Sequence, residues 1–537
     1  MTNSKDSGSE RKNDFKSIKP RSIRWWPALV ILLLAGGALI WVRFFQDDVN
    51  HQNQNIQTAQ VVIIAFVALL LWGFFFSRLR WKIQFLVFGG LVGLICLTAL
   101  LFRIRGVTGD LLPVLDWRWK KPLNSTLAIR QTAQPETATS LPTQQITQTT
   151  NDYPQFLGPH RNCTVSGPPL ARDWKSQPPR LLWRQPIGTA WSGFAIAGNF
   201  AVTQEQRGEE EMVVGYDLQS GKPIWSHADS AHYNTTIAGE GPRATPTIVS
   251  NHVYALGATG ILNCLDLVTG KLIWTKDIIK DNQSQVNGWG MSGSPLVFDT
   301  LAVVSAGGPN GRSLVAYDRA TGEFVWGGGS DGAGYSSPLL TTLAGVPQIL
   351  IFNSSGIVAH ETERGTILWE YPWPKGHPHI AMPVILPDDR VLLSSGYGTG
   401  SELLQVKKTA EGKWSASRIW KSIRLKAKFT NVVCREGYIF GLDDGILVCL
   451  DAANGEQKWK EARYGHGQVI LVGDLLLVMA ENGDVILVEP VPQEHRELTR
   501  FSALNGKTWN PPALAGELLL VRNDKEAACY RLPVAKR

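Results

Sequence analysis

The sequence predicts an all-β, eight-bladed β-propeller preceded by three transmembrane α-helices. Three observations lead to this fold class: three long apolar runs near the N-terminus, a repeated turn that ends in tryptophan, and the overall composition. The 537 residues include 52 Gly and 20 Trp, and only 18% are charged. Disordered and coiled-coil chains are richer in charge and poorer in aromatic residues, so a folded chain with many turns and buried rings is expected.

Three apolar runs without a charged residue occupy positions 25–42, 59–76 and 85–102. Each run has 18 residues, which at 1.5 Å per residue cross most of a hydrocarbon core about 30 Å thick. Basic residues bound the runs, and tryptophans near their ends fit the aromatic belts of membrane interfaces. Three such runs in tandem predict transmembrane helices rather than buried globular helices.

The basic residues beside these runs predict the orientation, because short basic flanks resist translocation. The first 24 residues hold seven Lys/Arg, whereas the first loop, 43–58, holds one. We expect a cytoplasmic N-terminus in the bacterial inner membrane and a head on the periplasmic, extracytoplasmic side. The five Lys/Arg within 103–121 count mildly against this orientation, although a long folded domain can translocate despite flanking charge.

The net charge of +7 belongs to the N-terminal part of the chain. Residues 1–121 hold 16 Lys/Arg and 7 Asp/Glu, whereas the remaining residues hold 37 and 39. The head is thus almost neutral, and we expect no nucleic-acid partner. A stretch rich in Thr, Gln, Ser and Pro near 122–152 reads as a flexible tether. The predicted parts are a cytoplasmic basic tail (1–24), three transmembrane helices (25–105), a membrane-proximal segment with the tether (106–152) and the propeller (153–537).

A ten-residue repeat predicts the architecture of the head. Its form is apolar, Asp, two variable residues, Ser/Thr/Asn, Gly, Lys/Glu, two variable residues and Trp, as in LDLVTGKLIW at 265–274. We interpret it as a strand end, a tight turn capped by Asp with Gly at positive φ, and a strand that buries Trp. The residues with this structural role are Asp217, Gly221, Trp225, Asp266, Gly270, Trp274, Asp318, Gly322, Trp326, Gly365, Trp369, Asp451, Gly455 and Trp459.

The tryptophans of the outer strands also give the number of blades. They are Trp183, Trp225, Trp274, Trp326, Trp369, Trp420 and Trp459, and Phe501 occupies an eighth, degenerate position. Trp183 has no inner strands before it, and the C-terminal segment has inner strands without an outer one. Closure of the last blade by the N-terminal strand would remove the free sheet edges. We therefore expect eight blades, with seven as the alternative.

At this point the repeats resemble a known group, the tryptophan-docking repeats of the pyrroloquinoline-quinone (PQQ) dehydrogenase superfamily, over about residues 153–537. Segments such as GPRATPTI, GYSSPLL and YGHGQVILV are more similar to a family of bacterial envelope proteins with PQQ-binding-like propeller repeats. The same fold occurs in the propeller lipoprotein of the outer-membrane barrel-assembly machinery. The resemblance implies the fold, and it leaves the function open.

Cysteines and short motifs add no assured cofactor or metal. Cys264, Cys449 and Cys529 occupy equivalent repeat positions in separate blades and read as buried small apolar residues, whereas a disulfide between Cys163 and Cys434 stays open. The sequence has no CxxCH motif and no CxxC pair. We interpret Asp443 and Asp444 as an acidic hairpin turn rather than a calcium loop.

In a propeller, the loops that enter the innermost strands converge on one rim of the central channel. Residues in these loops form the predicted ligand site, which is rich in rings and cations and would suit an anionic small molecule. The alternative is that these side chains simply plug the channel. The candidates are Trp191, Glu240, Arg243, Trp289, Tyr335, His379, Lys428, His466, Lys507 and Trp509.

Three functions compete. The one that we rank first is a non-enzymatic binding or scaffold module of the cell envelope, with the membrane and an envelope protein as partners. The second, implied by the resemblance, is a membrane-bound dehydrogenase that uses PQQ with calcium to oxidise alcohols or sugars. Many members of that class carry a disulfide between adjacent cysteines, and no adjacent pair occurs in this sequence. The third is a periplasmic sensor or binder of an anionic small molecule.

Overall fold

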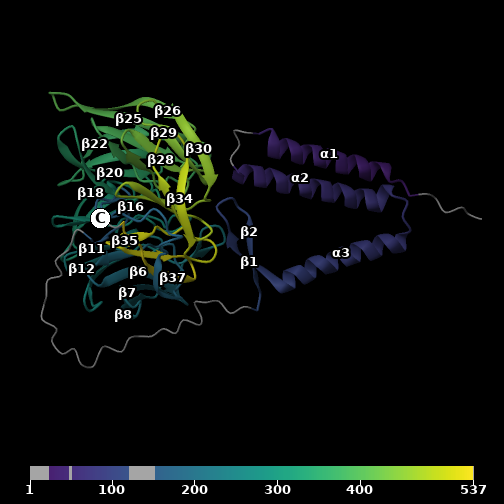
Figure 1. The fold of residues 1–537 in the computed structure, drawn as a ribbon, viewed down its shortest axis with the longest axis horizontal. Helices are drawn as coiled ribbons and strands as arrows, with labels where there is room; N and C mark the ends of the chain where they lie inside the picture. Colours follow the sequence, from purple (N-terminus) through teal and green to yellow (C-terminus); the bar gives the residue numbers. More distant parts are fainter. Residues whose placement is uncertain (1–22, 47–50, 120–150, 536–537) are drawn as a thin grey trace, which may run out of the picture. The chain divides into compact units, whose positions relative to one another are not determined.

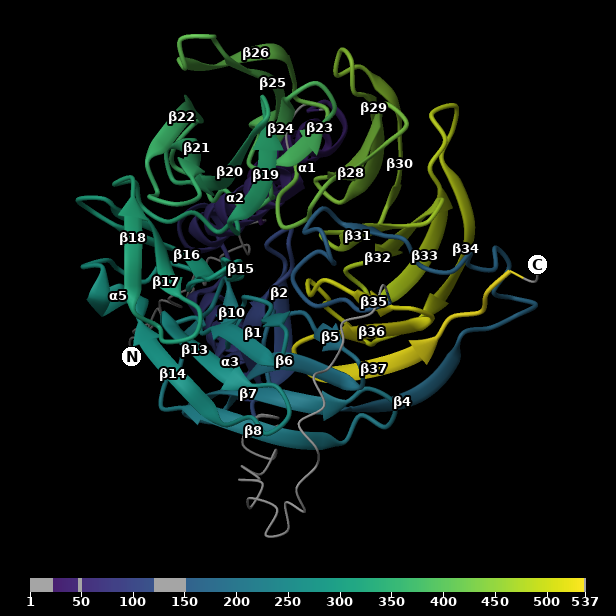
Figure 2. The same ribbon diagram turned by 90° about the vertical axis from the view of Figure 1, so that its left-hand side faces the viewer.

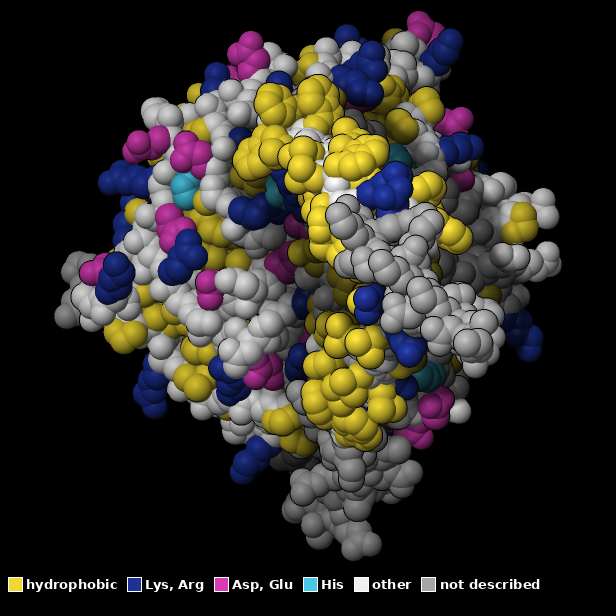
Figure 3. All heavy atoms as spheres, turned by 90° about the vertical axis from the view of Figure 1, so that its right-hand side faces the viewer, with side chains coloured by type: hydrophobic (Ala, Val, Ile, Leu, Met, Phe, Trp, Pro, Cys, Tyr) yellow, Lys and Arg dark blue, Asp and Glu magenta, His cyan; other side chains and the backbone are white. Residues whose placement is uncertain are grey.

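The computed structural model describes residues 23–46, 51–119 and 151–535, which form two compact units, Met1–Arg103 and Ile104–Arg537. The first unit contains three helices: α1 (Trp26–Phe44), α2 (His51–Leu71), which a short π-helix η1 (Trp72–Phe76) continues, and α3 (Trp81–Leu101). All three are long and apolar enough to cross a membrane, and their apolar side chains are largely exposed (Figure 3).

The helices follow the three predicted apolar runs. Helix α2 begins at His51, before its apolar run, because the polar stretch that precedes the run is also helical. The Arg43 guanidinium at the end of α1 donates a hydrogen bond to Asn55 Oδ1 of this stretch at 2.9 Å. A polar stretch of this kind carries no hydropathy signal, so the run alone does not mark where the helix starts.

The second unit is a ring of eight blades around a channel (Figures 1 and 2). Each blade is an antiparallel sheet of four strands, and the first strand named for each blade lies innermost. Blade 1 comprises β5 (Ala195–Ala197), β6 (Phe200–Arg207), β7 (Glu210–Asp217) and β8 (Pro223–Asp229), and blade 2 comprises β11 (Thr247–Val249), β12 (His252–Leu256), β13 (Ile261–Asp266) and β14 (Leu272–Asp277). Blade 3 comprises β15 (Leu296–Phe298), β16 (Leu301–Gly308), β17 (Arg312–Asp318) and β18 (Phe324–Gly328), and blade 4 comprises β19 (Leu339–Leu343), β20 (Val346–Asn353), β21 (Gly356–Glu361) and β22 (Ile367–Pro372).

Blades 5 to 8 complete the ring. Blade 5 comprises β23 (Val384–Leu386), β24 (Arg390–Ser395), β25 (Gly400–Lys408) and β26 (Trp414–Ser422), and blade 6 comprises β27 (Val433–Arg435), β28 (Tyr438–Asp443), β29 (Ile446–Asp451) and β30 (Gln457–Arg463). Blade 7 comprises β31 (Gln468–Val472), β32 (Leu475–Met479), β33 (Asp484–Glu489) and β34 (Arg496–Ser502), and blade 8 comprises β35 (Ala513–Ala515), β36 (Leu518–Arg522), β37 (Glu526–Arg531) and β4 (Arg180–Pro186). The eight-bladed propeller is thus confirmed.

The N-terminal strand β4 closes blade 8, as expected. It pairs antiparallel with β37, and Trp183 lies opposite Cys529. A buried side chain then joins blade 8 to blade 1: the Arg522 guanidinium donates hydrogen bonds to Thr203 Oγ1 at 2.7 Å, Gln204 O at 2.8 Å and Gly188 O at 2.8 Å. Strand β4, which precedes the first blade in the chain, thus completes the last blade and ties the two ends of the propeller together.

The repeated turn works as predicted and adds a contact between blades. In blade 2, Asp266 Oδ1 accepts a hydrogen bond from the Thr269 amide at 2.8 Å, and Gly270 has φ +69°. The ring of Trp225, from blade 1, packs on Gly270, where a Cβ atom would lie 2.6 Å from it, and Trp225 Nε1 donates to Leu267 O at 2.8 Å. Glycine is thus required both for its conformation and for the close approach of the tryptophan.

Other short elements decorate the ring. A hairpin of β1 (Phe102–Val107) and β2 (Pro113–Trp117) precedes the blades, and β3 (Thr164–Val165) adds to β31 in parallel. Between blades 1 and 2, β9 (Asn234–Thr235) pairs with β10 (Gly239–Glu240). The four-residue helix α5 (Ile278–Asp281) departs from the all-strand expectation, because Asp277 caps it by accepting hydrogen bonds from the Ile279 and Lys280 amides.

Candidate binding site at the channel mouth

Five aromatic rings form a continuous cluster where the inner strands begin, at the end of the channel that we call the channel mouth. Along the cluster, the ring centroids are 4.9 Å apart for Trp191 and Trp509, 5.0 Å for Trp509 and Phe429, 6.1 Å for Phe429 and Trp289, and 5.4 Å for Trp289 and Tyr335. These separations are those of favourable offset and edge contacts. Four of the five residues were predicted for this rim.

Two lysines, the buried Lys428 and the half-buried Lys507, lie against this aromatic cluster. Lys507 Nζ lies 4.6 Å from the ring centroid of Trp191 and 4.1 Å from that of Trp509, and Lys428 Nζ lies 5.3 Å from that of Phe429. Contacts of this kind offset part of the cost of burying an ammonium group. Burial still lowers the pKa of both lysines, and that of Lys507 falls to about 8.

The turn of the hairpin β1–β2, which we call the channel hairpin, sits on these lysines. Lys507 Nζ donates a hydrogen bond to Val107 O at 3.0 Å, and Lys428 Nζ donates to Gly109 O at 2.6 Å. A Cβ atom on Gly109 would lie 2.0 Å from His466 Cδ2, so only glycine fits this close approach. The cations predicted to bind an anionic ligand therefore bind backbone carbonyls of the same chain.

Acidic groups complete the contacts with the channel hairpin. Glu481 Oε1 accepts hydrogen bonds from the Gly109 amide and from Trp509 Nε1, both at 2.8 Å. His466 Nε2 lies 3.1 Å from Asp110 Oδ1, and Arg105 forms an ion pair with Asp524 at 2.9 Å. Burial raises the pKa of Asp524. The turn is thus held by side chains from four loops of the ring.

Three predicted site residues, Glu240, Arg243 and His379, have other partners. Glu240 Oε1 lies 3.2 Å from His232 Nε2. Arg243 Nη2 donates to Gly239 O at 2.7 Å, its guanidinium lies 4.6 Å from the ring centroid of Tyr233, and burial lowers its pKa to about 10.

His379, the third of these residues, is buried beside a neighbouring blade. Its ring stacks on Phe352 at 4.6 Å, and its two nitrogens lie 2.5 Å from Asn353 O and 2.9 Å from Pro374 O. These contacts hold the ring between loops of the propeller rather than in the aromatic cluster.

Our sequence analysis missed Phe429, Glu481 and Asp524, together with the hairpin residues that they meet. Glu481 and Asp524 lie in turns between the second and third strands of their blades, which reach the same rim as the loops that we considered. Asp444 occupies the equivalent turn of blade 6. An acidic residue at this position in three successive blades is a signal in the sequence that could have identified them.

Acidic side chains and cysteines elsewhere have structural partners. Asp443 forms ion pairs with Lys426 at 2.7 Å and Lys460 at 2.5 Å, which agrees with an acidic turn. Within the described ranges, no group of three His, Cys, Asp or Glu side chains is placed to hold a metal ion. The cysteines, including Cys163 and Cys434, are free thiols, and those at the three equivalent repeat positions are buried.

Comparison with known proteins supports the predicted family. A family model described as outer membrane protein assembly factor BamB matches residues 209–461. BamB from Kangiella koreensis is 28% identical over 116 residues, which are 21% of this chain. The match spans 26% of that protein, about a quarter of its length.

Several solved structures are similar over most of their length. BamB from Moraxella catarrhalis has 15% identity and a TM-score of 0.49, and the match covers 67% of this chain and 99% of that one. A europium-containing methanol dehydrogenase has 11% identity and a TM-score of 0.45, with 72% and 98% covered. Over residues 209–461 this chain is therefore similar to the family that this model describes, and the Trp-bearing repeats agree with that similarity.

Proposed function

We propose that this protein is a membrane-anchored, non-enzymatic docking module of the bacterial cell envelope, in which the propeller presents a rigid surface to a protein partner. One observation carries the proposal: the channel mouth, where a small-molecule site is expected, is filled by the chain's own hairpin turn. Lys428 and Lys507 donate to this turn, so they are not available to an anionic small molecule while the hairpin is in place. The BamB-like repeats are consistent with a role in protein assembly.

The side chains at the channel mouth do not fit PQQ with calcium. Calcium takes six to eight oxygen ligands, mostly from converging carboxylates and carbonyls. Two of the carboxylates here are already engaged: Glu481 accepts hydrogen bonds from Gly109 and Trp509, and Asp524 pairs with Arg105. We therefore derive no redox step at this site.

The location that we propose rests on the helices and their flanking charge. Among the described residues, helices α1, α2 and α3 can each cross a membrane, and three spans would put the residues before α1 and those after α3 on opposite sides. Because the first 24 residues hold seven Lys/Arg, we assign the N-terminus to the cytoplasm and the propeller to the periplasmic side of the inner membrane.

The enzymatic alternative is tested with the purified full-length protein in detergent. The protein is mixed with PQQ and calcium, its visible absorption is recorded, and alcohols and sugars are offered with an artificial electron-accepting dye. We expect no bound chromophore and no dye reduction above a control without protein. Dye reduction that requires PQQ would overturn the proposal.

The orientation is tested by labelling introduced cysteines with a membrane-impermeant maleimide. Glu411→Cys places a thiol on the exposed β25–β26 turn, and Lys5→Cys places one in the basic tail. We expect labelling of the first in intact spheroplasts and of the second only after lysis, relative to the unmodified chain with its own six cysteines. The reverse pattern would place the propeller in the cytoplasm.

A further inference from the structure

Residues 153–165 lie at the end of the channel opposite the mouth, which we call the far end. Strand β31 runs from Gln468, beside His466 at the mouth, to Val472, and Val165 of β3 pairs with Val472. The far end therefore lies about 13 Å from the mouth at the usual rise per strand residue.

The segment 153–165 follows the inner strands of four blades. Tyr153 forms a β-bridge with Ile196 of blade 1, Pro154 O accepts a hydrogen bond from the Ile248 amide of blade 2 at 2.8 Å, and β3 pairs with β31 of blade 7. Arg161 Nη2 donates to Ser294 O, just before blade 3, at 2.9 Å. The inner strands of blades 4, 5 and 6 receive no strand from this segment within the described residues.

The loop within this segment is held in an unfavourable conformation. Leu157, Arg161 and Cys163 have φ of +62°, +54° and +60°, the left-handed region that side-chain-bearing residues rarely adopt. Residues of this kind cluster at ligand sites, where the surrounding structure holds them. The loop is therefore fixed in a specific shape.

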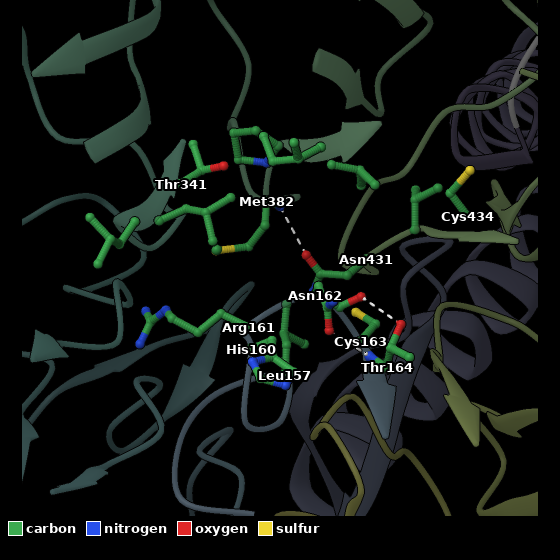
Figure 4. A pocket seen from close by; sticks show the side chains of 16 residues that line it. Leu157, His160, Arg161, Asn162, Cys163, Thr164, Thr341, Met382, Asn431 and Cys434 are labelled. Atoms are coloured by element: carbon green, nitrogen blue, oxygen red, sulfur yellow. Dashed lines mark hydrogen bonds between the residues drawn. The ribbon is translucent and has the colours of Figure 1, made fainter. Parts of the chain in front are cut away.

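A cavity of about 230 Å³ lies between this loop and blades 4, 5 and 6, whose inner strands receive no strand from the segment (Figure 4). Met382 and Asn431, which are joined by a hydrogen bond of 2.9 Å from the Met382 amide to Asn431 Oδ1, face the loop residues Leu157 to Thr164 across it. Its wall includes residues of the inner strands β19, β23 and β27, and combines leucine, valine and methionine side chains with threonine and asparagine side chains.

The wall of the cavity carries positive charge without negative charge. None of its residues is Asp or Glu. Arg161 is buried, its hydrogen-bond partners are the neutral groups Gln155 Oε1, Ser294 O and Pro295 O, and its Nε has no partner within the described residues. A buried cation without a carboxylate is costly, and a ligand with an acidic group would offset part of that cost.

We propose that the far end binds an extended, apolar peptide segment with an acidic residue, supplied by a partner protein, whose backbone pairs with the free edge of β23. This inference rests on the docking role proposed above and names the chemistry of the docked ligand. Strands β19, β23 and β27 are each paired on one side only, so they offer unpaired backbone groups to the channel. The chain itself shows the binding mode, because β3 adds to the inner edge of β31 two blades away.

The size of the cavity favours part of a peptide over a whole small molecule. Pockets for drug-sized ligands enclose roughly 300–1,000 Å³. A cavity of about 230 Å³ is smaller, and it suits one or two side chains of a strand that continues along the channel. In strand addition, backbone hydrogen bonds supply affinity and pockets for alternate side chains supply specificity.

The test uses full-length protein in detergent and the fluorescein-labelled probe Val-Thr-Val-Asp-Val-Thr-Val, with binding read by fluorescence anisotropy. We expect saturable binding that weakens about ten-fold or more when Lys replaces Asp in the probe, or when the central amides are N-methylated and cannot pair. Equal binding of all three probes would overturn the proposal, and so would the absence of binding.

Two variants place the binding in the cavity. Val384→Glu puts a negative charge in the wall, and we expect it to weaken binding of the acidic probe by about ten-fold or more. Leu272→Glu, on an exposed outer strand of blade 2, is the matched control and should leave binding unchanged. If Val384→Glu has an unaltered melting temperature and still binds the probe with unchanged affinity, the cavity is excluded as the binding site.

Two further results are informative. The first distinguishes a partner peptide from the chain's own segment as the occupant, and the second distinguishes failure of the far-end site from failure of the docking role. A ten-fold or larger gain in probe affinity after deletion of residues 122–148 would overturn the partner assignment in favour of the chain's own segment. PQQ-dependent dye reduction would remove the docking role without changing probe binding, whereas loss of probe binding would remove only the far-end site.

Discussion

At the channel mouth, the channel hairpin meets two lysines, a glutamate and a cluster of aromatic rings; at the far end, residues 153–165 meet backbone edges and leave a cavity. The first set of contacts depends on charge and therefore on pH. The second depends on strand pairing and a strained loop, and its buried cation, Arg161, has a pKa that burial lowers to about 9. The propeller thus has a channel mouth that is closed by charged side chains, and a far end at which an added strand could still bind.

The closed ring supports both ends, so opening it should have the largest effect. Arg522→Met removes three buried hydrogen bonds between blades 8 and 1 and leaves their acceptors unpaired. We expect the free energy of unfolding to fall by about 3–5 kcal/mol. Chemical denaturation measures it, with Arg531→Met, an exposed position of β37, as the control. A loss equal to that of the control would show that the two blades close without this side chain.

Glu481→Gln should loosen the mouth alone. The glutamate accepts hydrogen bonds from the amides of Gly109 and His466 and from Trp509 Nε1, and the amide group of glutamine would turn a donor toward one of these donors. We expect hairpin docking to weaken by about 1–3 kcal/mol. Hydrogen exchange at residues 107–112 should accelerate while that at 163–165 stays unchanged; Glu494→Gln, at an exposed position, is the control. Equal acceleration at both ends would remove the distinction between them.

The pH dependence of Lys507 should separate the two ends further. Its pKa of about 8 lies below the value of about 10.4 for a free lysine, so between these values the unfolded state binds more protons. The free energy of unfolding should therefore rise with pH across about pH 8 to 10, by up to about 3 kcal/mol, and the destabilisation is fully present below pH 8.

The measurement compares the parent chain with Lys507→Met by denaturation at several pH values. Their difference in free energy of unfolding should grow through this window, whereas Lys375→Met, at an exposed position, should show no such trend. A constant difference for Lys507→Met would show that the lysine is not titrated at the mouth.

An exposed contact of the same turn should have the smallest effect. Arg463 forms a 3.3 Å ion pair with Asp110, and its side chain is about one third exposed, whereas His466 holds the same aspartate from a buried position. We expect Arg463→Ala to accelerate hydrogen exchange at Asp110 by less than about five-fold, because exposed ion pairs contribute about 0–1 kcal/mol. A larger effect would mean that closure of the mouth depends on surface charge.

The propeller was predictable because one packing contact, that of a tryptophan on a glycine of the next blade, recurs in its repeats. Trp225 and Gly270 recur as a pair around the propeller, so their spacing in the sequence reveals both the blade count and the closure by Trp183. The rim residues were partly predictable, since loops that enter inner strands converge. Trp191 and Trp509 meet there, whereas His379 is drawn into a neighbouring blade by Phe352.

The channel hairpin was not predictable from the sequence. Val107 meets Lys507 and Gly109 meets Lys428 across more than 300 residues, and no periodicity marks a contact of this kind. The loop conformation of Leu157 and Cys163 has no sequence signal either, because neither residue favours positive φ. Contacts made once in a fold leave no repeating pattern to detect.

The position of the channel hairpin has a consequence for protease action. A single cut within residues 122–148 would separate the helices from the blades in the covalent chain, yet the hairpin would remain with the helical fragment and stay bound to Lys428, Lys507 and Glu481. Shedding of the propeller from the membrane would then require two events, cleavage and dissociation of the hairpin. The rate of release after cleavage would be set by the strength of the channel mouth.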